Sequence, residues 1–585
     1  MDAAPRQPPF ALLLLAAWLL VVLQLVLQHW PETALALNDT DDAMRLVQLR
    51  AFLGGQGWFD LHEARVQPPA GYDPHWSRLI DAGLAGLYLV LRPFADPAQA
   101  ERLMRVIWPM LWLLPAIVGV AAIAWRIAGR EAALLVLLSV AIGLPAFQQF
   151  KPGRIDHHNV QIALAVLTVA ATVWSDRARW CAVAAGMLTG LGLAVGFEAM
   201  PFLVLCGAVI AVRYLTTNVA ADALRNYGIA AALSTTAGFA ATVAPSHWTQ
   251  GACDSIAVNS AAAVAIGGLG LALVTLRRDA GRLERCALVA VVAAIAAIAF
   301  AIAEPRCLLG PYAMVDPAVK PIWLVHVREM QPLWAVFADN PAIGLGIAVF
   351  PAAAVVAIVM LARGDLRCDF GFLTASAALL LAVAMMFAAI KGYTYAMWLA
   401  MPLVAAMALR LCSLFRLTSP VLRFATALLL TPMVLSAGAI SLAHAAGLDR
   451  PNNRYPERKA CFKTASYTAL ARLPAGLVVA DIDYGPFLLA LTPHSVLAAP
   501  YHRLSAGIVE AHRIFASPPD DARRIATRAG TRYIVLCSNR APSDLPEAQR
   551  SASLWGRLQS GVIPDWLIAE PVAAGEPFRI YRVRS

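Results

Sequence analysis

Charged residues are scarce in this chain. Asp, Glu, Lys and Arg make up 14% of its 585 residues, whereas soluble domains carry about 25%. Hydrophobic residues make up 59% of the chain. This balance excludes an ordinary soluble protein and predicts that the chain lies in a membrane.

Several signature motifs are also missing. The sequence has no P-loop, no dinucleotide-binding fingerprint and no Cys-x-x-Cys pair, so nothing in it indicates ATP coupling or a structural zinc. The net charge of +10 does not indicate nucleic acid, because the basic residues are spread through short loops between apolar runs. Such spreading is typical of topology signals rather than of a basic patch, and we expect no nucleic-acid partner.

Long apolar runs, in contrast, are abundant. A membrane-spanning helix needs roughly 20 mostly apolar residues, and we interpret thirteen segments as spans. We take the first as an uncleaved span rather than a signal peptide, because no small-x-small cleavage site follows it cleanly. The spans are 10–27, 104–125, 131–148, 160–174, 181–195, 200–215, 227–244, 256–276, 286–303, 341–362, 371–390, 393–411 and 422–446.

Lys and Arg in the short loops set the orientation of these spans. With the N-terminus in the cytoplasm, basic residues fall in the inside loops, whereas the outside loops 196–199 and 245–255 hold none. An odd number of spans then places residues 447–585 outside. We therefore predict a multi-pass protein of the bacterial inner membrane, with a transmembrane domain over 1–446 and a periplasmic domain over 447–585.

Three outside loops interrupt the apolar helices, at 28–103, 149–159 and 304–340. The first contains HWSRLIDAGLAGLYLVLRPF, whose apolar run is too short to span and predicts an interfacial helix. The sequence after residue 446 has a different pattern from the long apolar runs before it. Short apolar runs in GLVVADID, SVLAAP and TRYIVLCS predict strands, and the segments between them predict helices, so we expect a small α/β domain there.

Three Asp residues follow the first span in LNDTDDAMRL, namely Asp39, Asp41 and Asp42. One Asp is enough to cap the N-terminus of a helix, and three within four residues exceed that need. Closely spaced carboxylates are hard oxygen ligands for Mg²⁺ or Mn²⁺. Helix capping and metal binding both stay open for this cluster.

The second outside loop carries Asp156, His157 and His158 in GRIDHHN. A carboxylate and an imidazole in one tight loop suit a transition-type ion such as Mn²⁺ better than Mg²⁺, although Asp156 as a helix cap explains the loop equally well. Late in the third loop, VHVREMQP contains Glu329, which taken alone reads as a surface carboxylate. Glu198 in VGFEAMP lies at a membrane edge and is a lesser candidate.

The combination of these sites is more informative than any one of them. Charge counting assigns all three loops to the same side of the membrane, and acidic residues beside a membrane are costly unless they have a role. We expect Asp42, Asp156, His158 and Glu329 to converge on one divalent ion, Mn²⁺ or Mg²⁺. Such an ion can stabilise a departing phosphate, as in the transfer of a sugar from a lipid pyrophosphate, without ATP.

On these motifs the chain resembles the catalytic subunit of oligosaccharyltransferases, within the GT-C class of membrane glycosyltransferases. The family has thirteen spans and a C-terminal extracytoplasmic domain, and its first outside loop carries an Asp that binds the metal and engages the acceptor. Here the resemblance assigns that catalytic role to Asp41 or Asp42, in DDAMRL. The family's Asp-x-Asp or Asp-x-Glu pair is matched by Asp156 and His158, with His in place of the second carboxylate.

The resemblance extends to three further regions. Glu329 matches a catalytic Glu of the family's long loop, although VHVREM lacks the hydroxyl residue that the family has before this Glu. Lys391, in IKGYTYAMW, matches a basic residue that contacts the donor pyrophosphate, usually Arg in the family. The family's Trp-Trp-Asp-Tyr-Gly motif recognises the acceptor, and here Asp483, Tyr484 and Gly485 remain without either tryptophan.

The cysteines divide between compartments under this topology. Four of them fall outside, an even number in an oxidising space, and free buried thiols are the alternative. We predict two disulfides, Cys253–Cys307 between outside loops and Cys461–Cys537 within the tail.

Three functions are consistent with these features. The first is an inverting, oligosaccharyltransferase-like enzyme that moves a glycan from a polyprenyl pyrophosphate to a protein asparagine. The second is a related GT-C enzyme that uses a polyprenyl-phosphate sugar to modify a lipid or envelope glycan. The third is a transporter or flippase, which the loop placement of the acidic residues and the lack of an internal repeat disfavour. We expect the chain to act as a monomer in the lipid bilayer.

Overall fold

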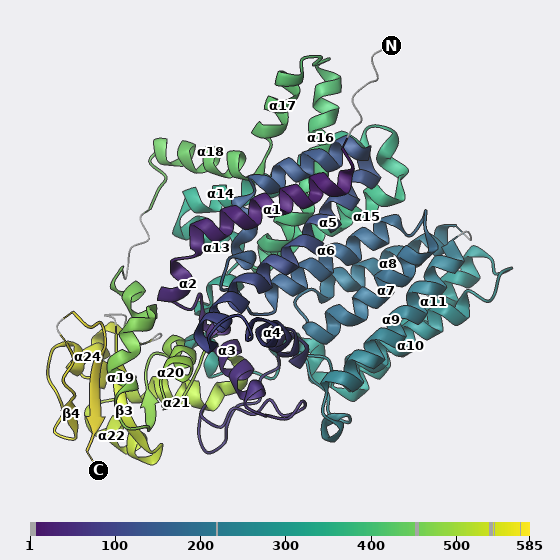
Figure 1. The fold of residues 1–585 in the computed structure, drawn as a ribbon. Helices are drawn as coiled ribbons and strands as arrows, with labels where there is room; N and C mark the ends of the chain where they lie inside the picture. Colours follow the sequence, from purple (N-terminus) through teal and green to yellow (C-terminus); the bar gives the residue numbers. More distant parts are fainter. Residues whose placement is uncertain are drawn as a thin grey trace.

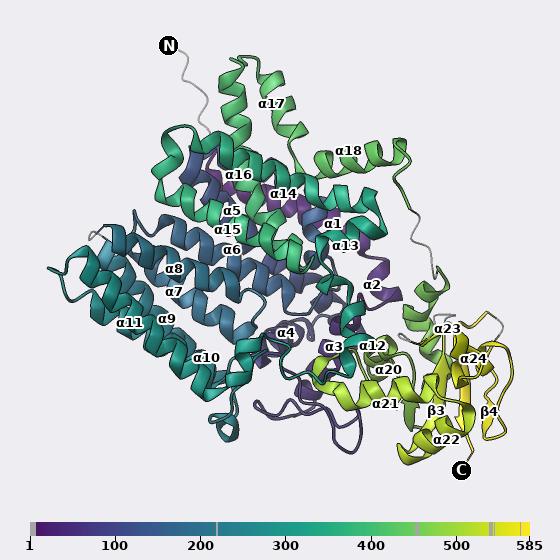
Figure 2. The same ribbon diagram turned by 180° about the vertical axis from the view of Figure 1, so that it is seen from behind.

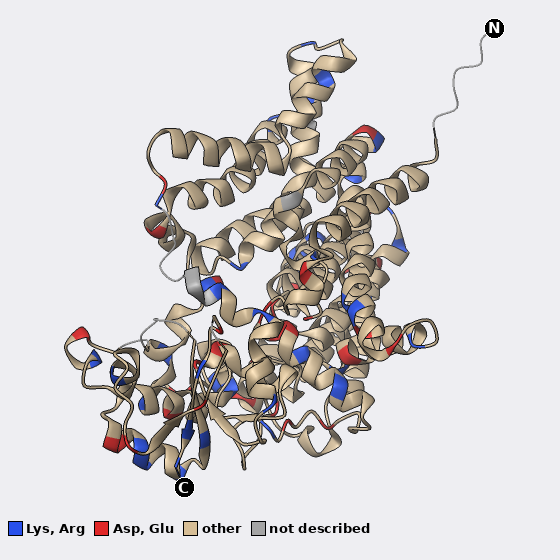
Figure 3. Cartoon of the chain, turned by 60° about the vertical axis from the view of Figure 1, so that its left-hand side comes forward, with Lys and Arg blue, Asp and Glu red and all other residues tan. Residues whose placement is uncertain are grey.

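The protein is a multi-pass membrane protein with an α-helical bundle and a small C-terminal α/β domain. It is described by a computed structural model, which covers residues 8–217, 220–450, 456–537, 542, 545–573 and 575–584. Figures 1 and 2 show the helices of the bundle side by side, with the C-terminal domain at one end, next to α3. The bundle helices are almost free of charge, and charged residues gather in the loops and the C-terminal domain (Figure 3).

A helix lies over every segment that the sequence predicted to span. The bundle consists of α1 (Phe10–His29), α5 (Pro97–Ala141), α6 (His158–Trp174), α7 (Arg179–Val195), α8 (Met200–Thr216), α9 (Ala221–Thr242), α10 (Val258–Val274), α11 (Arg282–Ala303), α14 (Pro341–Ala362), α15 (Phe370–Ala388), α16 (Gly392–Leu414), α17 (Pro420–Leu429) and α18 (Pro432–Ala445).

The count of thirteen spans is not confirmed by length and composition. Among the described residues, six helices are long and apolar enough to cross a membrane, or seven if the bent pair α17 and α18 forms one span. Helix α5 joins two predicted spans across a break at Ala128 and Gly129, where Gly129 has φ 78°. Helices α6, α7, α8 and α10 have only 17 residues each, so they fall below the usual length.

The first outside loop folds into α2 (Glu32–Leu35), α3 (Thr40–Leu53) and α4 (Arg78–Leu91). Asp39 caps α3 by accepting hydrogen bonds from the backbone N–H groups of Asp41 and Asp42. Helix α4 lies in the segment predicted to be interfacial. It buries Ile80 and Leu84, whereas Leu89 and Val90 at its end are exposed.

The third outside loop contains only short elements. These are η4 (Pro305–Leu309), α12 (Val319–Ile322), η5 (Leu324–His326), η6 (Arg328–Met330) and α13 (Leu333–Asp339). A disulfide joins Cys307 in this loop to Cys253 between α9 and α10, with the Cα atoms 5.0 Å apart. The loop therefore has a covalent anchor despite its lack of long helices.

The C-terminal domain is built on a five-stranded sheet of order β2-β1-β3-β5-β4. Strands β1 (Leu477–Val479), β2 (Ser495–Val496) and β3 (Thr531–Leu536) are parallel, and β4 (Leu567–Ala569) and β5 (Arg579–Val583) add an antiparallel edge. The predicted strands correspond to β1, β2 and β3.

The helices of the C-terminal domain are α19 (Thr468–Ala471), α20 (Gly485–Leu491), α21 (Ser505–Ala516), α22 (Pro519–Arg528), α23 (Glu547–Arg550) and α24 (Leu554–Gln559). Cys461 and Cys537 form a disulfide here, with a Cα–Cα distance of 6.0 Å.

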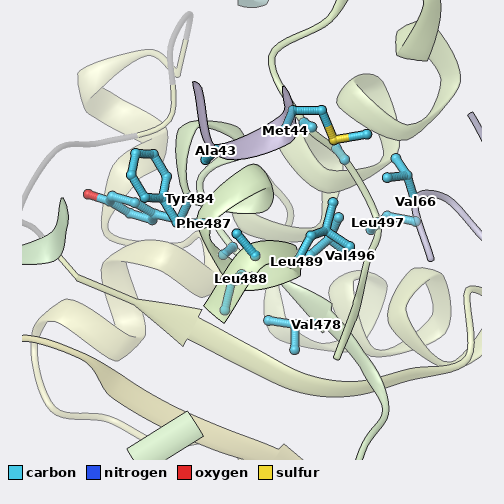
Figure 4. Packing of buried hydrophobic residues seen from close by; sticks show 14 of the residues in the cluster. Ala43, Met44, Val66, Val478, Tyr484, Phe487, Leu488, Leu489, Val496 and Leu497 are labelled. Carbon is cyan, nitrogen blue, oxygen red and sulfur yellow. The ribbon is translucent and has the colours of Figure 1, made fainter. Parts of the chain in front are cut away.

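The C-terminal domain and the first outside loop share one hydrophobic core. Figure 4 shows Ala43 and Met44 of α3 packed over Phe487, Leu488 and Leu489 of the C-terminal domain. Burying such side chains contributes roughly 25 cal/mol per Å² of apolar surface, so this core fixes the position of the C-terminal domain on the loop.

Backbone hydrogen bonds join the same two parts at the sheet edge. Val66 forms a parallel bridge with Val496 of β2. The N–H of Gln67 donates to the Val496 carbonyl at 2.7 Å, and the Val496 N–H donates to the Arg65 carbonyl at 2.8 Å. The first loop thereby covers an edge strand that would otherwise present unpaired backbone groups.

Candidate active site

One large cavity lies between the bundle, the outside loops and the C-terminal domain. Its volume is about 1030 Å³. The lining contains polar residues from every part of the chain on which the sequence placed a candidate: Asp39, Asp41, His75, Arg154, His157, His158, Glu198, Tyr312, Glu329, Lys391, Asp481, Asp483, Tyr484, Tyr501 and His502. The cavity thus brings together segments that are hundreds of residues apart.

The two neighbouring Asp residues at the start of α3 face different surroundings. Asp41 lines the cavity and is half-buried. Asp42 is buried, and its Oδ1 accepts hydrogen bonds from the backbone N–H groups of Ile155 at 2.7 Å and Asp156 at 3.1 Å. Asp42 therefore holds the second outside loop against α3, and Asp41 presents its carboxylate to the cavity.

The second outside loop contributes a guanidinium, a carboxylate and an imidazole. Arg154 pairs with Asp39, with Asp156 and with Asp42 Oδ2, the last at 3.0 Å from Nη1. Asp156 Oδ1 accepts the backbone N–H of His158 at 2.9 Å, and its Oδ2 lies 3.0 Å from His158 Nδ1. Asp156 is fully buried, so its carboxylate is the shared partner of Arg154 and His158.

A second charged group lies on the other side of His158. Its centre is Glu198, whose oxygens lie 3.4 Å from His158 Nε2 and 3.6 Å from His157 Nε2, and which pairs with Lys391. Glu329 Oε1 lies 3.6 Å from Lys391 Nζ, and the Lys391 backbone N–H donates to the Glu329 carbonyl at 3.0 Å. Lys391 is thus the cation between the two glutamates.

The cavity alters the pKa values of its acidic residues. Burial raises the pKa of Asp41 to about 7 against the opposing charge of His158, and Asp156 adds to the rise. Burial likewise raises the pKa of Asp42 well above its usual range, with Asp156 contributing. Burial disfavours the charged form of Asp156 too, but Arg154 and His158 outweigh it and hold its pKa well below the usual range. Burial lowers the pKa of His158, but Asp156 and Glu198 outweigh it and raise that pKa well above the usual range. The acidic residues therefore favour a cation beside them, either this imidazolium or a bound ion.

Among the described residues, four groups of side chains could hold a divalent ion, and one of them consists of His75, Asp254 and His502. Asp41, Asp156 and His158 each offer one ligand atom, and these atoms lie within 4.8 Å of one another. Both ring nitrogens of His158 are buried, and within the described part of the chain neither has a hydrogen-bond partner of good geometry. Imidazole and carboxylate ligands together suit ions such as Mn²⁺ or Zn²⁺. Asp39, Asp42 and Asp156 form another such group, but Arg154 contacts all three carboxylates.

Glu329 lies apart from the groups of clustered ligand atoms. It lines the same cavity, but it is exposed, and the groups found among the described residues do not include it. Glu198, which the sequence marked only as a lesser candidate, lies within 4.8 Å of His157 and His158 in such a group. No sequence pattern indicates this pairing, because it depends on how the loop after α7 packs against α6.

The C-terminal domain forms the opposite wall of the cavity. Asp483 and Tyr484 both line it. The Tyr484 ring is buried against Phe462 and Phe578, with centroid distances of 5.2 and 5.7 Å. A Cβ on Gly485 would collide with the Ala498 carbonyl oxygen. Asp483 is thus the half-buried member of the motif, and its two neighbours pack the turn.

A charged contact also holds this wall in place, and sequence reasoning missed its partner residue. Asp254, between α9 and α10, accepts hydrogen bonds from Arg503 at 2.7 and 2.8 Å and lies 2.6 Å from His502 Nε2. The Tyr501 hydroxyl donates to the Thr40 carbonyl at 2.9 Å. The wall is therefore attached both to α3 and to the loop that carries Cys253.

Comparison with known proteins supports the same architecture. No protein-family model matches the chain, and no curated protein matches it in sequence. Its structure is similar to that of the archaeal oligosaccharyltransferase AglB from Archaeoglobus fulgidus in complex with an inhibitory peptide and a dolichol-phosphate, with a TM-score of 0.65 over 90% of this chain and 69% of the other, at 14% identity. The chain has the fold of an oligosaccharyltransferase.

Two other structures of the Archaeoglobus fulgidus oligosaccharyltransferase give the same result. One, tethered to an acceptor peptide containing the NVT sequon, has a TM-score of 0.63 over 89% of this chain and 68% of the other, at 14% identity. Another, in complex with Zn and sulfate, has a TM-score of 0.61 over 90% and 67%, also at 14% identity. The GT-C type of fold that the sequence motifs predicted is therefore confirmed.

Proposed function

We propose that this protein is a membrane glycosyltransferase that moves a glycan from a polyprenyl-(pyro)phosphate donor to an acceptor on the periplasmic face of a bacterial inner membrane, as in protein N-glycosylation. The observation that carries the proposal is the single cavity that joins the acidic outside loops, Lys391 and the wall of the C-terminal domain. A transferase needs a donor site and an acceptor site that meet at one point, and this cavity supplies both kinds of surface.

The proposed donor side consists of Lys391 and the carboxylate cluster. A divalent ion, Mn²⁺ or Mg²⁺, held by Asp41, Asp156 and His158 would neutralise charge on the departing phosphate. Lys391 Nζ lies beside the same region between two glutamates, where its ammonium group can bind a phosphate oxygen. Asp42 would support this side by holding the second loop, rather than as a direct ligand.

The proposed acceptor side consists of Asp41, Glu329 and Asp483. Asp41 and Glu329 are carboxylates at the cavity surface, where they can accept hydrogen bonds from the attacking group of an acceptor. Asp483 faces the same cavity from the C-terminal domain, and Tyr484 and Gly485 would hold it in position. Inversion at the anomeric carbon and action as a monomer are parts of the same proposal.

A second acceptor class is favoured by one feature. Asp481 and Ile482 precede Asp483 on the cavity wall, at the positions where oligosaccharyltransferases carry two tryptophans. A GT-C enzyme that transfers a polyprenyl-phosphate sugar to a lipid or envelope glycan would not need those tryptophans.

Mass spectrometry of envelope proteins and lipids tests the proposal. Cells with the chain should contain a glycan conjugate that is missing from cells without it and from cells with Asp41→Asn. Loss of an Asn-linked glycan would identify a protein acceptor, and loss of a modified lipid or envelope glycan would identify the second class. Identical protein and lipid profiles in all three cell types would contradict the function. In purified protein, EDTA should abolish transfer and Mn²⁺ should restore it.

A further inference from the structure

The carboxylate cluster at the cavity has two halves that share Asp156. One half consists of Asp41, Asp156 and His158, and the other of Asp39, Asp42 and Asp156. In each half the ligand atoms lie within 4.8 Å of one another, so the distances alone would allow an ion in either half. The two halves differ in what already lies between their carboxylates.

Arg154 occupies the half formed by Asp39, Asp42 and Asp156. Its Nη1 contacts Asp39 and lies 3.0 Å from Asp42 Oδ2, and its Nη2 contacts Asp156 and lies 2.7 Å from Gln149 Oε1. The Arg154 side chain is 9% exposed. A guanidinium keeps its charge at any physiological pH, so this half holds a permanent cation.

The other half has no such cation. Among the described residues Arg154 forms no salt bridge with Asp41 or His158, and the two ring nitrogens of His158 lack a hydrogen-bond partner of good geometry. Asp156 Oδ2 lies between the halves, because it contacts both Arg154 and His158 Nδ1. Any ion bound beside Asp41 therefore shares a carboxylate with a fixed positive charge.

We infer that Arg154 is a built-in cation that fills one half of the carboxylate cluster, limits the protein to a single divalent ion in the other half and lowers its affinity for that ion. The inference rests on the proposed metal dependence, but it concerns binding rather than transfer. Two like charges on one carboxylate repel each other, and the repulsion is strong where burial excludes water. Removal of the guanidinium should therefore raise metal affinity, which is the opposite of the effect of removing a ligand.

To test this, the full-length protein is treated with EDTA and titrated with Mn²⁺. Electron paramagnetic resonance measures the concentration of free Mn²⁺ at each step. The wild-type protein should bind one Mn²⁺ per chain. Arg154→Gln should either bind a second Mn²⁺ or bind the first with a Kd at least about tenfold lower. The matched control is Arg126→Gln, because Arg126 is equally buried and pairs with two carboxylates, Asp176 and Asp369, away from the cavity. It should bind Mn²⁺ as the wild-type protein does.

A double variant identifies the half of the cluster that gains the ion. Asp39→Asn keeps the N-cap of α3, because Asn caps as well as Asp, but it removes one carboxylate from the half that holds Arg154. Addition of Asp39→Asn to Arg154→Gln should abolish a second Mn²⁺ site, whereas a lower Kd for the first ion should persist, because Asp39 is not a ligand in that half. Arg154→Gln with wild-type stoichiometry and a Kd within twofold of wild type would overturn the inference, as would two ions bound to the wild-type protein.

Two single variants keep the inference testable if Arg154→Gln does not fold. Asp41→Asn should weaken Mn²⁺ binding at least about tenfold, whereas Asp39→Asn should change it less than about threefold. Equal losses in both would overturn the inference. A wild-type protein that binds no Mn²⁺ would contradict the proposed metal dependence instead, and gain of a site in Arg154→Gln would then still support the role of Arg154.

Discussion

Two buried clusters in this protein combine Asp and Arg in opposite ratios. In the first outside loop, Asp81 lies between Arg45 and Arg78, at 2.9 and 3.1 Å, and all three side chains are 0% exposed. At the cavity, the single guanidinium of Arg154 lies among three carboxylates. The first cluster has more guanidinium groups than carboxyl groups, and the second has more carboxyl groups than guanidinium groups.

The surplus of the first cluster is met in part by neutral groups of the fold, although Nε and Nη2 of Arg45 are buried without a hydrogen-bond partner among the described residues. Arg78 donates to the backbone carbonyls of Trp58 and Gly57 and lies 4.8 Å from the Phe52 ring. The cavity cluster borders an open space instead, because Asp39 and Arg154 line the cavity together with Asp41. Buried charges by themselves therefore do not identify a site. The informative feature is a surplus of one sign that only a ligand can neutralise.

The largest effect is expected from removal of the carboxylate that both halves of the cavity cluster share. Asp156→Asn should reduce transfer at least about 10³-fold, because Arg154 and His158 both lose their partner and the proposed ion loses a ligand. The initial rate with a lipid-linked donor measures this. Asp176→Asn, which removes a partner of Arg126 elsewhere, should stay within about threefold of wild type. Activity of Asp156→Asn within tenfold of wild type would show that the cluster is structural.

The second largest effect should appear in stability rather than in chemistry. Asp81→Asn leaves two buried guanidinium groups without a counter-charge and should lower the free energy of unfolding by about 3 kcal/mol. Denaturant titration in detergent measures the change, and Mn²⁺ binding by the folded fraction should not alter. Asp521→Asn, which breaks an exposed pair with Arg524, should change stability by less than about 0.5 kcal/mol. A change in Mn²⁺ affinity for Asp81→Asn would contradict the proposed difference between the clusters, in which only the cavity cluster takes part in metal binding.

An intermediate effect is expected at the cation between the two glutamates. Lys391→Met keeps the length of the side chain but removes the charge that pairs with Glu198 and Glu329, so the KM for the donor should rise about 10- to 100-fold. The acceptor KM should change much less. Lys320→Met, at an exposed lysine of the third outside loop, provides the control. A drop in kcat alone, with unchanged donor KM, would show that Lys391 does not bind the donor.

The smallest effect is expected at the contact that holds the C-terminal wall. Asp254→Asn weakens the hydrogen bonds from His502 and Arg503, and we expect the acceptor KM to rise about fivefold because the wall is less well positioned. Donor binding should not change. Asp73→Asn alters an exposed side chain near the same arginine and should have no measurable effect. Equal changes in donor and acceptor KM would indicate a general loss of structure.

Local sequence signals were enough to predict the helices and part of the site. Helix α14 covers 341–362, as predicted, because Asn340 and Pro341 mark its start and Arg363 follows its apolar run. The Asp-x-His motif places Asp156 and His158 on one short turn, so their contact depends only on nearby residues. Such features need no knowledge of the rest of the fold.

Long-range packing decided what the sequence could not predict. Arg154 stands in the same motif, but its partner Asp39 is set by how α3 meets the second loop. Strand β5 was not among the predicted strands, yet it pairs with both β3 and β4. The metal-ligand groups contain Glu198 rather than Glu329 for the same reason, since both residues come from loops whose contacts are distant in sequence.

The core shared by the first outside loop and the C-terminal domain also constrains how the protein is made. During synthesis the loop emerges early, whereas its partner strand β2 and helix α20 are translated more than 400 residues later. Until then Met44 and Val66 lack the side chains and backbone groups that cover them. The finished cavity therefore requires the whole chain, and a ribosomal stop before residue 447 would yield a membrane protein with an exposed, protease-sensitive first loop.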